Sequence, residues 1–394
     1  MITNITARAK TFFAKPIFHD RRTILWLWVG LSVLAALLKY NRTDNNFRIF
    51  RGVFWHTLQG TSLYEAYPAE YFDVNHYGPF FSLIIAPFAV IPIPIGMVFW
   101  CIALSLTLYF AVTRSTFSSR QQMFVLWFCS ETLLTSLFMQ QFNIAIAAII
   151  IASYALIEKE RDFWAAFLIV LGTLVKLYGI VGLAFFFFSR HKGKFVLSLL
   201  FWGVVLFVAP MIISSPAYVV SQYHEWMVCL VEKNGENLAS VAQNISALGM
   251  VRRMLGSPEY SDLWLLAPAL LLFALPYLRV KQWRNEGFRL TLLASVLLFT
   301  VLFSTGSESS SYIIALSGVC VWYFAAPWQR SKHDIWLMVF VFLLSSMGSS
   351  DLYPRTIRHE YIQAFSLKAL PCLIVWLKLC WEMATKEYGP NSKP

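Results

Sequence analysis

Two carboxylates in the first polar stretch of the chain can take part in proton transfer. Asp44 and Asp73 lie in residues 41–78, between an apolar block at 24–40 and a shorter apolar run at 79–91. A carboxylate at a membrane face can serve as the general base that deprotonates a hydroxyl group. Both residues can equally be solvated loop acids, so the sequence leaves two interpretations open for each of them.

Amides and a lysine occupy two turns between later apolar blocks. Gln140, Gln141 and Asn143 share one turn, where their side chains can bind sugar hydroxyls or phosphate oxygens or can satisfy the ends of helices. Lys176 has no acidic neighbour in the sequence, so its ammonium group suits an anionic lipid phosphate. The alternative is a lysine whose side chain extends to the membrane surface.

Further polar candidates lie in the second half of the chain. Asn244 precedes the adjacent Arg252 and Arg253, which can bind a phosphate or diphosphate bidentately or can face water and lipid headgroups. Two later turns carry residues that can bind substrate or cap helices: Glu308, Tyr312, Asp351 and Arg355. Glu131 lies inside an apolar block, where an ionisable group should face the interior of the helix bundle.

The elements that position these residues are membrane helices. Of the 394 residues, 58% are hydrophobic and 13% are charged, whereas soluble domains are roughly 45–50% apolar. We expect an all-α polytopic membrane protein with a single domain over residues 1–394. The apolar blocks predict about twelve transmembrane helices, at residues 24–40, 94–113, 121–139, 144–157, 163–176, 178–189, 195–213, 263–278, 290–303, 312–327, 334–349 and 362–382.

The placement of charge predicts the topology. With a cytoplasmic N-terminus, the cytoplasmic gaps hold 20 of the 32 lysines and arginines, in agreement with the positive-inside rule. These gaps are residues 1–23, 114–120, 158–162, 190–194, 279–289, 328–333 and 383–394. Both termini are therefore predicted to be cytoplasmic, in a multi-pass protein of the cytoplasmic membrane. Twelve of the 21 acidic residues then fall on the outer side.

The same topology assigns two ambiguous stretches. Residues 79–91 are short and run into Pro92, and a full crossing there would place every later basic gap outside, so a half-helix or re-entrant element is favoured. Residues 163–189 have basic gaps at both ends, so they must turn near Lys176 at the outer face. A long outer loop is predicted over residues 214–262.

The first outer loop, residues 41–78, has helical periodicity. Apolar side chains recur at Phe47, Phe50, Phe54 and Leu58, which predicts an amphipathic helix on the membrane surface. Gly60 would end this helix.

Several functional classes lack support. The net charge is +11, but no basic run is interleaved with exposed aromatic residues, so we expect no nucleic-acid partner. The sequence has no Walker A, GxSxG, HExxH or dinucleotide-binding motif. We therefore expect neither a metal nor another cofactor.

Short motifs along the chain resemble those of glycosyltransferase family 87. The first are Asn46-Phe47-(x)2-Phe50, Leu58-(x)-Gly60-(x)2-Leu63-Tyr64 and Tyr77-Gly78-Pro79. Gln141-Phe142-Asn143 and Leu174-Val175-Lys176-Leu177-Tyr178-Gly179 are similar to the family's Gln-x-Asn and Ile-Lys-x-x-Pro elements, and Gln243-Asn244-Ile245-Ser246-Ala247-Leu248-Gly249 resembles its Asn-Gln-Ser segment. The motifs follow the family's order over most of the chain.

The resemblance implies a GT-C fold, in which outer loops on a bundle of membrane helices bind a polyprenyl-phosphate sugar and a lipid or glycan acceptor. It implies an inverting, metal-independent hexosyltransferase of the mannosyltransferase-like type, in which a carboxylate deprotonates the acceptor while lipid phosphate leaves. The candidate bases are Asp73, Asp44 and Glu308. The candidate substrate-binding residues are Asn46, Gln141, Asn143, Lys176, Asn244, Arg252, Arg253, Tyr312 and Arg355.

Two positions depart from the family pattern. Family members of the mannosyltransferase type carry Asp where this chain has Asn46, and an amide cannot act as a general base. Gly179 stands where the family has proline after the lysine. Either the base has moved to another carboxylate or the chain is not an active transferase of that kind.

A non-enzymatic transporter or lipid flippase is the alternative function. Glu131 inside an apolar block and the many predicted spans favour it. However, the long outer loop at residues 214–262 has no earlier counterpart, so the sequence lacks the internal repeat that many transporters have. A cavity open to the outer face would favour the transferase, and a midplane site around Glu131 would favour transport.

Overall fold

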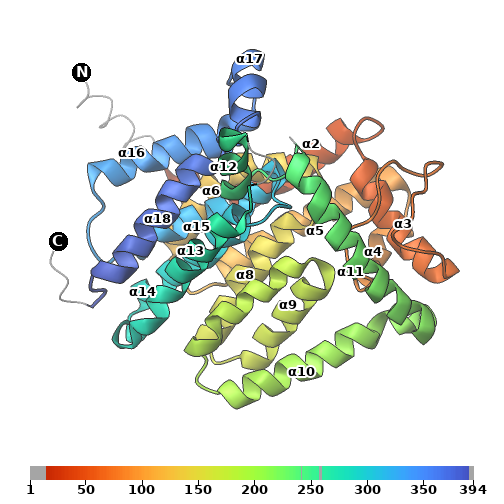
Figure 1. Ribbon diagram of the computed structural model, residues 1–394, viewed down its shortest axis with the longest axis horizontal. Coiled ribbons are helices and arrows are strands. Elements are labelled where there is room, and N and C mark those ends of the chain that lie inside the picture. Colours follow the sequence, from red (N-terminus) through yellow and green to blue (C-terminus); the bar gives the residue numbers. More distant parts are fainter. Residues whose placement is uncertain (1–14, 241, 257–259, 390–394) are drawn as a thin grey trace.

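The protein is built from helices. The computed structural model describes residues 15–240, 242–256 and 260–389, and none of these residues belongs to a strand (Figure 1). The all-α expectation is therefore confirmed. Arg8 and Lys10 of the predicted cytoplasmic N-terminus lie outside the described residues, as does Glu259.

The helices of the first half include both long and short segments. They are α2 (Arg21–Lys39), α3 (Asn45–Gln59), α4 (Phe81–Ala89), α5 (Ile93–Thr113), α6 (Ser119–Phe128), α7 (Ser130–Phe138), α8 (Asn143–Glu158), α9 (Asp162–Val175), the 3₁₀ helix η2 (Leu177–Phe188) and α10 (Lys192–Val208). The second half contains α11 (Pro216–Ala239), α12 (Ala247–Leu255), α13 (Leu263–Ala274), α14 (Glu286–Leu302), α15 (Tyr312–Ala325), α16 (Lys332–Phe340), the π-helical segment η7 (Val341–Ser346), α17 (Arg355–Ile357) and α18 (Ala369–Thr385).

Three described helical segments are long and apolar enough to cross a membrane. They are α2, α5 and the stretch Lys192–Ile212, which continues α10. Shorter apolar helices coincide with other predicted blocks. They lie at Asn143–Glu158, Asp162–Val175, Leu177–Phe188, Leu263–Leu278 and Ser309–Ala325. These segments make the chain a helical membrane protein, whereas the prediction of about twelve crossings rests on the sequence pattern.

The centre and the edge of the bundle differ in exposure. Most residues of α8, α14 and α15 are buried. By contrast, α10 runs along the lower edge in Figure 1 and exposes Leu197, Leu200 and Val204 by 64% or more. An apolar helix with an apolar exposed face is the arrangement expected where lipid covers the protein.

The amphipathic helix of the first loop is present as α3. Phe47, Phe50 and Phe54 are buried on one face of the helix, as their spacing predicts. Gly60 follows with φ of 71°, a left-handed conformation that glycine adopts without steric cost and that ends the helix. The next apolar run forms α4, whose nine residues span roughly 14 Å, less than half of a bilayer core. The helix is too short for a full crossing, in agreement with the half-helix or re-entrant interpretation of residues 79–91, whose placement in the membrane stays a prediction.

The predicted long outer loop, residues 214–262, is mostly helical, and its longest helix was not predicted. Ser215 accepts a hydrogen bond from the backbone N–H of Tyr218 and caps α11, a helix of 24 residues. Its sequence mixes apolar, polar and charged residues, so it resembles a polar interval although one side packs on the first loop. Gln222 of this helix accepts a hydrogen bond from the backbone N–H of Leu63 at 2.7 Å.

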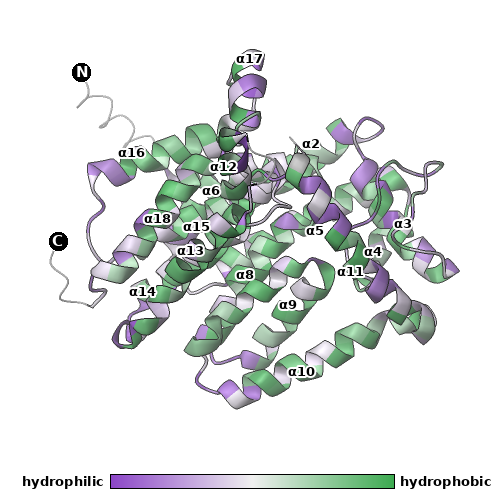
Figure 2. Ribbon diagram, viewed as in Figure 1, coloured by the Kyte–Doolittle hydropathy of each residue, from purple (hydrophilic) through white to green (hydrophobic). Residues whose placement is uncertain are grey.

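The seven predicted basic gaps meet at one end of the bundle, which we call the basic end. Figure 2 shows hydrophobic residues along α8, α9 and α10 and hydrophilic residues at the turns that join α8 to α9 and lead into α10. Contacts join neighbouring gaps, namely Arg21 with Ser119, Lys159 with the Arg114 carbonyl, Arg190 with Glu160, Arg289 with Glu158, Arg279 with Glu387, and Lys386 with the Trp328 ring. The orientation of this end toward the cytoplasm stays a prediction from charge.

Candidate active site

Two adjoining cavities lie at the end of the bundle opposite the basic end. α8 runs from Asn143 beside the cavities to Glu158 at the basic end, and α9 returns from Asp162 to Lys176. The small cavity has a volume of about 240 Å³ and the large cavity about 420 Å³. Residues that line both cavities are His76, Tyr77, Gln141, Gln243 and Glu308. The shared walls make the cavities two parts of one polar site.

A chain of hydrogen bonds crosses the floor of this site. The Lys176 ammonium donates to the Asn143 side-chain oxygen at 2.7 Å, and the Asn143 amide donates to the Gln141 side-chain oxygen at 2.9 Å. The Gln141 amide in turn donates to Glu308 Oε2 at 2.9 Å. The structure thus brings together four residues that the sequence identified as candidates, with two amides between the cation and the carboxylate.

Lys176 lies between α9 and η2, at the turn that the topology predicted. Its ammonium nitrogen is 5.0 Å from the centre of the Tyr178 ring and 5.8 Å from that of Tyr77, within the range of a cation–π contact. Burial lowers the pKa of Lys176 to about 8, and the nearby Glu308 carboxylate opposes that shift. The side chain is therefore still mostly charged at neutral pH.

The backbone at this turn is closely packed. The Gly78 N–H donates to the Val175 carbonyl at 3.0 Å, which joins the end of the first loop to the residue before Lys176. A Cβ atom on Gly78 would lie 2.0 Å from the Leu174 carbonyl oxygen. On Gly179 it would lie 2.2 Å from the Gly172 backbone, so the proline of the family pattern cannot fit here.

Asp73 lines the large cavity and keeps an available oxygen. Its Oδ1 accepts a hydrogen bond from the Val74 N–H at 2.8 Å, whereas Oδ2 accepts none from the residues that the structure describes. The residue has φ of 77°, a left-handed conformation that is uncommon outside glycine and is often found at functional sites. The side chain is 51% exposed, so a hydroxyl group can reach it.

His76 stands between the two cavities. Its Nε2 is 3.9 Å from Asp73 Oδ1, and its Nδ1 is 3.3 Å from the Cys229 sulfur. Burial, reinforced by Lys233, lowers the pKa of His76 to about 4, although Asp73 opposes this shift. The imidazole is therefore neutral at pH 7 and does not form an ion pair with Asp73 there.

Asp44 and Asn46 occupy different positions although they are close in sequence. Asp44 is buried, forms a 3.0 Å ion pair with Arg48, and lines an adjoining hollow that shares Thr43, Asn45 and Phe72 with the large cavity. Asn46 lines the large cavity, and its amide donates to the Met139 carbonyl at 2.8 Å. The structure therefore brings Asn46 and Asp73 to the same cavity and leaves Asp44 outside it.

Asn244 and Tyr312 lie behind the cavity wall. The Asn244 side-chain oxygen accepts from the Ser246 hydroxyl at 2.6 Å, and the Tyr312 hydroxyl donates to the Ile245 carbonyl at 3.1 Å. Both residues are almost fully buried. These contacts fix the segment around Asn244. Gln243, the residue before Asn244, lines both cavities.

The three candidate arginines do not line the site. Arg252 forms a 2.9 Å ion pair with Asp262. Arg253 donates to the backbone carbonyls of Ser240 and Gln243, each at 2.7 Å, and so fixes the chain beside the cavity. Arg355 is exposed in α17 and lines neither cavity.

Several lining residues were not predicted. Lys39, at the end of α2, lines the large cavity, and Lys233, in the middle of α11, lines the small one. His76 and Gln243 line both. The sequence carried a signal for Gln243, which lies in a recognised motif, but none for the two lysines, because only tertiary packing brings α2 and α11 to the site.

Glu131 lies apart from both cavities. Its carboxylate accepts hydrogen bonds from the Thr135 hydroxyl at 3.2 Å and from the Ser346 hydroxyl. The charge is therefore satisfied by hydroxyl donors within the bundle. Glu131 lines neither of the two cavities, so it does not belong to this candidate site.

The fold and the site define a helical membrane protein with a polar cavity of mixed charge at one end of its bundle. The profile of glycosyltransferase family 87 matches residues 75–305, and the chain belongs to that family. The matched residues include Gln141, Lys176 and Gln243, whereas Asn46 and Asp73 precede them. No curated protein matches the chain. Membership makes the protein a glycosyltransferase, with a sugar donor and an acceptor as its substrates.

Proposed function

We propose that the protein transfers a hexose from a polyprenyl-phosphate donor to a lipid or glycan acceptor at the outer face of the cytoplasmic membrane. One observation carries this proposal: Lys176 lines the small cavity and Asp73 lines the large cavity that adjoins it. A cation can stabilise the leaving phosphate, while a carboxylate accepts the proton of the attacking hydroxyl group.

The donor is assigned to the small cavity. Lys176 supplies a positive charge there, Lys233 lies beside it in a 3.0 Å ion pair with Glu236, and Leu177 and Leu230 supply an apolar side for a polyprenyl chain. Leu177 is 40% exposed, so the chain can leave the cavity along the surface of the bundle. A phosphate ester with a long hydrocarbon tail satisfies both features.

The acceptor is assigned to the large cavity, with Asp73 as the base. Asp73 takes the proton from the acceptor hydroxyl, and the oxygen forms a bond to the anomeric carbon as the bond to the lipid phosphate breaks. Attack from the face opposite the phosphate inverts the configuration, and Lys176 stabilises the phosphate that leaves. Glu308 is the less suitable base because Gln141 already donates to its Oε2 at 2.9 Å.

The test uses the purified full-length protein, labelled polyprenyl-phosphate hexoses and a panel of lipid acceptors. We expect transfer to one acceptor class, and Asp73→Asn should lower kcat by about 10²–10⁴-fold, the usual contribution of a general base. Glu65→Gln is the matched control, because Glu65 is an exposed acid of the same loop that lines neither cavity. Absence of transfer across the panel by the folded protein would refute the proposal.

A double variant tests whether the base has moved across the cavity. Asn46 and Asp73 line the same cavity, so Asn46→Asp should restore part of the transfer that Asp73→Asn removes. If Asp73→Asn alone is as active as the unaltered protein, the role passes to Glu308, and Glu308→Gln should then be inactive.

A further inference from the structure

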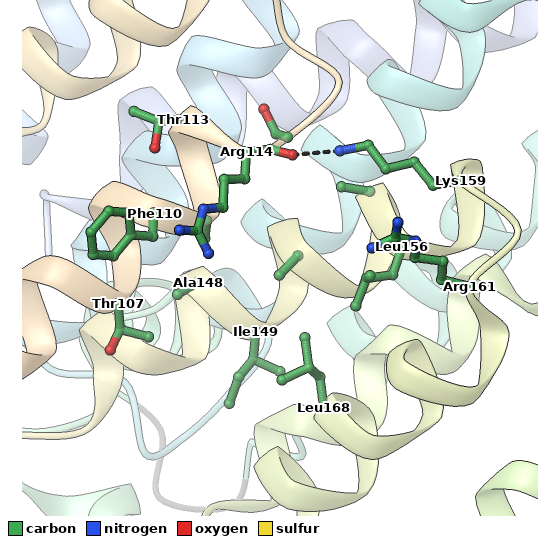
Figure 3. A pocket seen from close by; sticks show the side chains of 14 residues that line it. Thr107, Phe110, Thr113, Arg114, Ala148, Ile149, Leu156, Lys159, Arg161 and Leu168 are labelled. Atoms are coloured by element: carbon green, nitrogen blue, oxygen red, sulfur yellow. Dashed lines mark hydrogen bonds between the residues drawn. The ribbon is translucent and has the colours of Figure 1, made fainter. Parts of the chain in front are cut away.

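A third cavity lies at the basic end, far from the candidate active site. Its volume is about 720 Å³, and it opens between the end of α5, the last turns of α8 and the start of α9. Figure 3 shows Arg114 on one side, Lys159 and Arg161 on the other, and Ile149 and Leu168 between α8 and α9. No acidic residue lines this cavity. It therefore combines three positive charges with an apolar floor.

The charges of the α8–α9 turn are sorted around this cavity. Acids and bases alternate over residues 158–162, yet only the bases face the cavity. The acids are directed elsewhere, with Glu158 in an ion pair with Arg289, Glu160 in an ion pair with Arg190, and Asp162 buried in the first turn of α9. The cavity thus keeps its positive charge even though the turn itself carries more acids than bases.

The three cations have donors to spare. The Lys159 ammonium donates one hydrogen bond, to the Arg114 carbonyl at 2.6 Å, out of the three that it can make. The Arg114 guanidinium lies 4.9 Å from the centre of the Phe110 ring, which holds it over the cavity. The Arg161 side chain makes no hydrogen bond to any residue in the described part of the chain. These groups can bind an oxyanion without breaking an existing ion pair.

The apolar floor runs from the basic end toward the middle of the bundle. Ala148, Ile149 and Ala152 of α8 face Leu168 of α9, all within segments predicted to cross the membrane. Phe110, on α5, is 41% exposed beside them. A free phosphate ion would leave this floor uncovered, whereas the acyl chain of a lipid would cover it.

From this arrangement we infer that the cavity binds an anionic phospholipid of the leaflet at the basic end. The headgroup phosphate lies among Arg114, Lys159 and Arg161, and one acyl chain covers Phe110, Leu156 and Leu168, which are not fully buried. The inference does not rest on the proposed transfer reaction, because the site is at the other end of the bundle.

Native mass spectrometry of the full-length protein in detergent, titrated with phosphatidylglycerol or phosphatidylcholine, tests the inference. We expect tighter binding of phosphatidylglycerol and about fivefold weaker binding in Arg161→Gln, the effect of roughly one basic residue near a charged lipid surface. Arg161→Lys, which keeps the charge, should stay within about twofold of the unaltered protein. Lys332→Gln is the matched control, because Lys332 is an exposed lysine of the same end that does not line the cavity.

Three results would overturn the inference. Equal binding of the two lipids would remove the role of charge. An equal loss in Lys332→Gln would indicate only diffuse attraction to the basic end. Displacement of phosphatidylglycerol by millimolar inorganic phosphate would identify a soluble phosphate as the ligand instead. If thermal unfolding shows that Arg161→Gln does not fold, Arg114→Gln replaces it in the test, because the Arg114 side chain is also exposed.

Discussion

The basic end of the bundle and the floor of the candidate active site treat charge in opposite ways. At the basic end, guanidinium groups contact carboxylates directly, as in the 2.8 Å pair of Arg330 with Glu382, whose side chains are 6% and 2% exposed. At the site end, Gln141 and Asn143 stand between Lys176 and Glu308, so cation and carboxylate do not meet. Both arrangements use buried polar groups, but only the first neutralises them.

This difference separates stability from chemistry. A direct ion pair fixes two helices relative to each other and leaves little charge to act on a ligand. Amides that bridge two charges satisfy hydrogen bonds while each charge still acts at a distance. The site end can therefore offer a positive charge to a phosphate and a carboxylate to a hydroxyl group within one cavity.

The largest expected effect is on stability at the basic end. Arg330→Gln should lower the free energy of unfolding by about 3–5 kcal/mol, because it leaves the buried Glu382 carboxylate without its cation. The midpoint of thermal unfolding in detergent measures this effect. Arg284→Gln, at an exposed arginine of the same end, is the control and should change the midpoint little. Equal midpoints for the two variants would show that direct pairing does not stabilise this end.

The second effect is on catalysis at the site end. Lys176→Gln should lower transfer by about 10²–10³-fold, because the leaving phosphate loses the cation that stabilises it. Its unfolding midpoint should change far less than that of Arg330→Gln, because a glutamine can still donate to Asn143. Lys194→Gln, on α10 and away from both cavities, should keep full activity. A large loss of stability in Lys176→Gln would assign the lysine a structural role.

A smaller effect should appear in the pH profile. Because the pKa of Lys176 is lowered to about 8, its charge is present below that pH and is lost as the pH rises through it. Transfer should therefore fall above pH 8, by up to about tenfold per pH unit. Arg stays charged well above pH 10, so Lys176→Arg should retain the high-pH activity relative to its own maximum. An unchanged profile in Lys176→Arg would assign the decline to another group.

The smallest effect should come from an exposed ion pair on the site side. Arg358 contacts Asp351, whose side chain is 98% exposed. Solvent screens such a pair, so Arg358→Gln should cost less than about 1 kcal/mol of stability and should leave transfer unchanged. A loss comparable with that of Arg330→Gln would refute the distinction between buried and exposed pairing.

Periodicity and charge predicted much of the fold. The stripe of Phe47, Phe50 and Phe54 located α3, and the basic gaps identified one end of the bundle because charged turns cannot lie in the apolar interior. α11 was missed because its mixed polar sequence resembles a loop, although contacts with the first loop stabilise it as a helix. The break between α6 and α7 at Cys129 was also missed, since the sequence there remains apolar.

The candidate site was predicted only in part. Gln141, Asn143 and Lys176 lie in turns whose polar residues stand out against apolar blocks, and the structure joins them by hydrogen bonds. Arg252 and Arg253 formed an equally clear pattern, yet their partners, Asp262 and backbone carbonyls, depend on tertiary contacts that no local pattern carries.

Because Gly78 has no side chain, the end of the first loop can pack directly against the residues before Lys176. The Gly78 N–H donates a hydrogen bond to the Val175 carbonyl, which ties the loop segment that carries Asp73 to the turn that carries Lys176. In the proposed reaction, the separation of these two segments is the distance that the sugar, its nucleophile and its departing phosphate would bridge in line. A single added methyl group would meet the Leu174 carbonyl at 2.0 Å and stretch this distance, and a misalignment of about 1 Å can slow a reaction by roughly 10²-fold. Gly78 thus sets the distance between the proposed proton acceptor, Asp73, and the lysine that would hold the leaving group, Lys176.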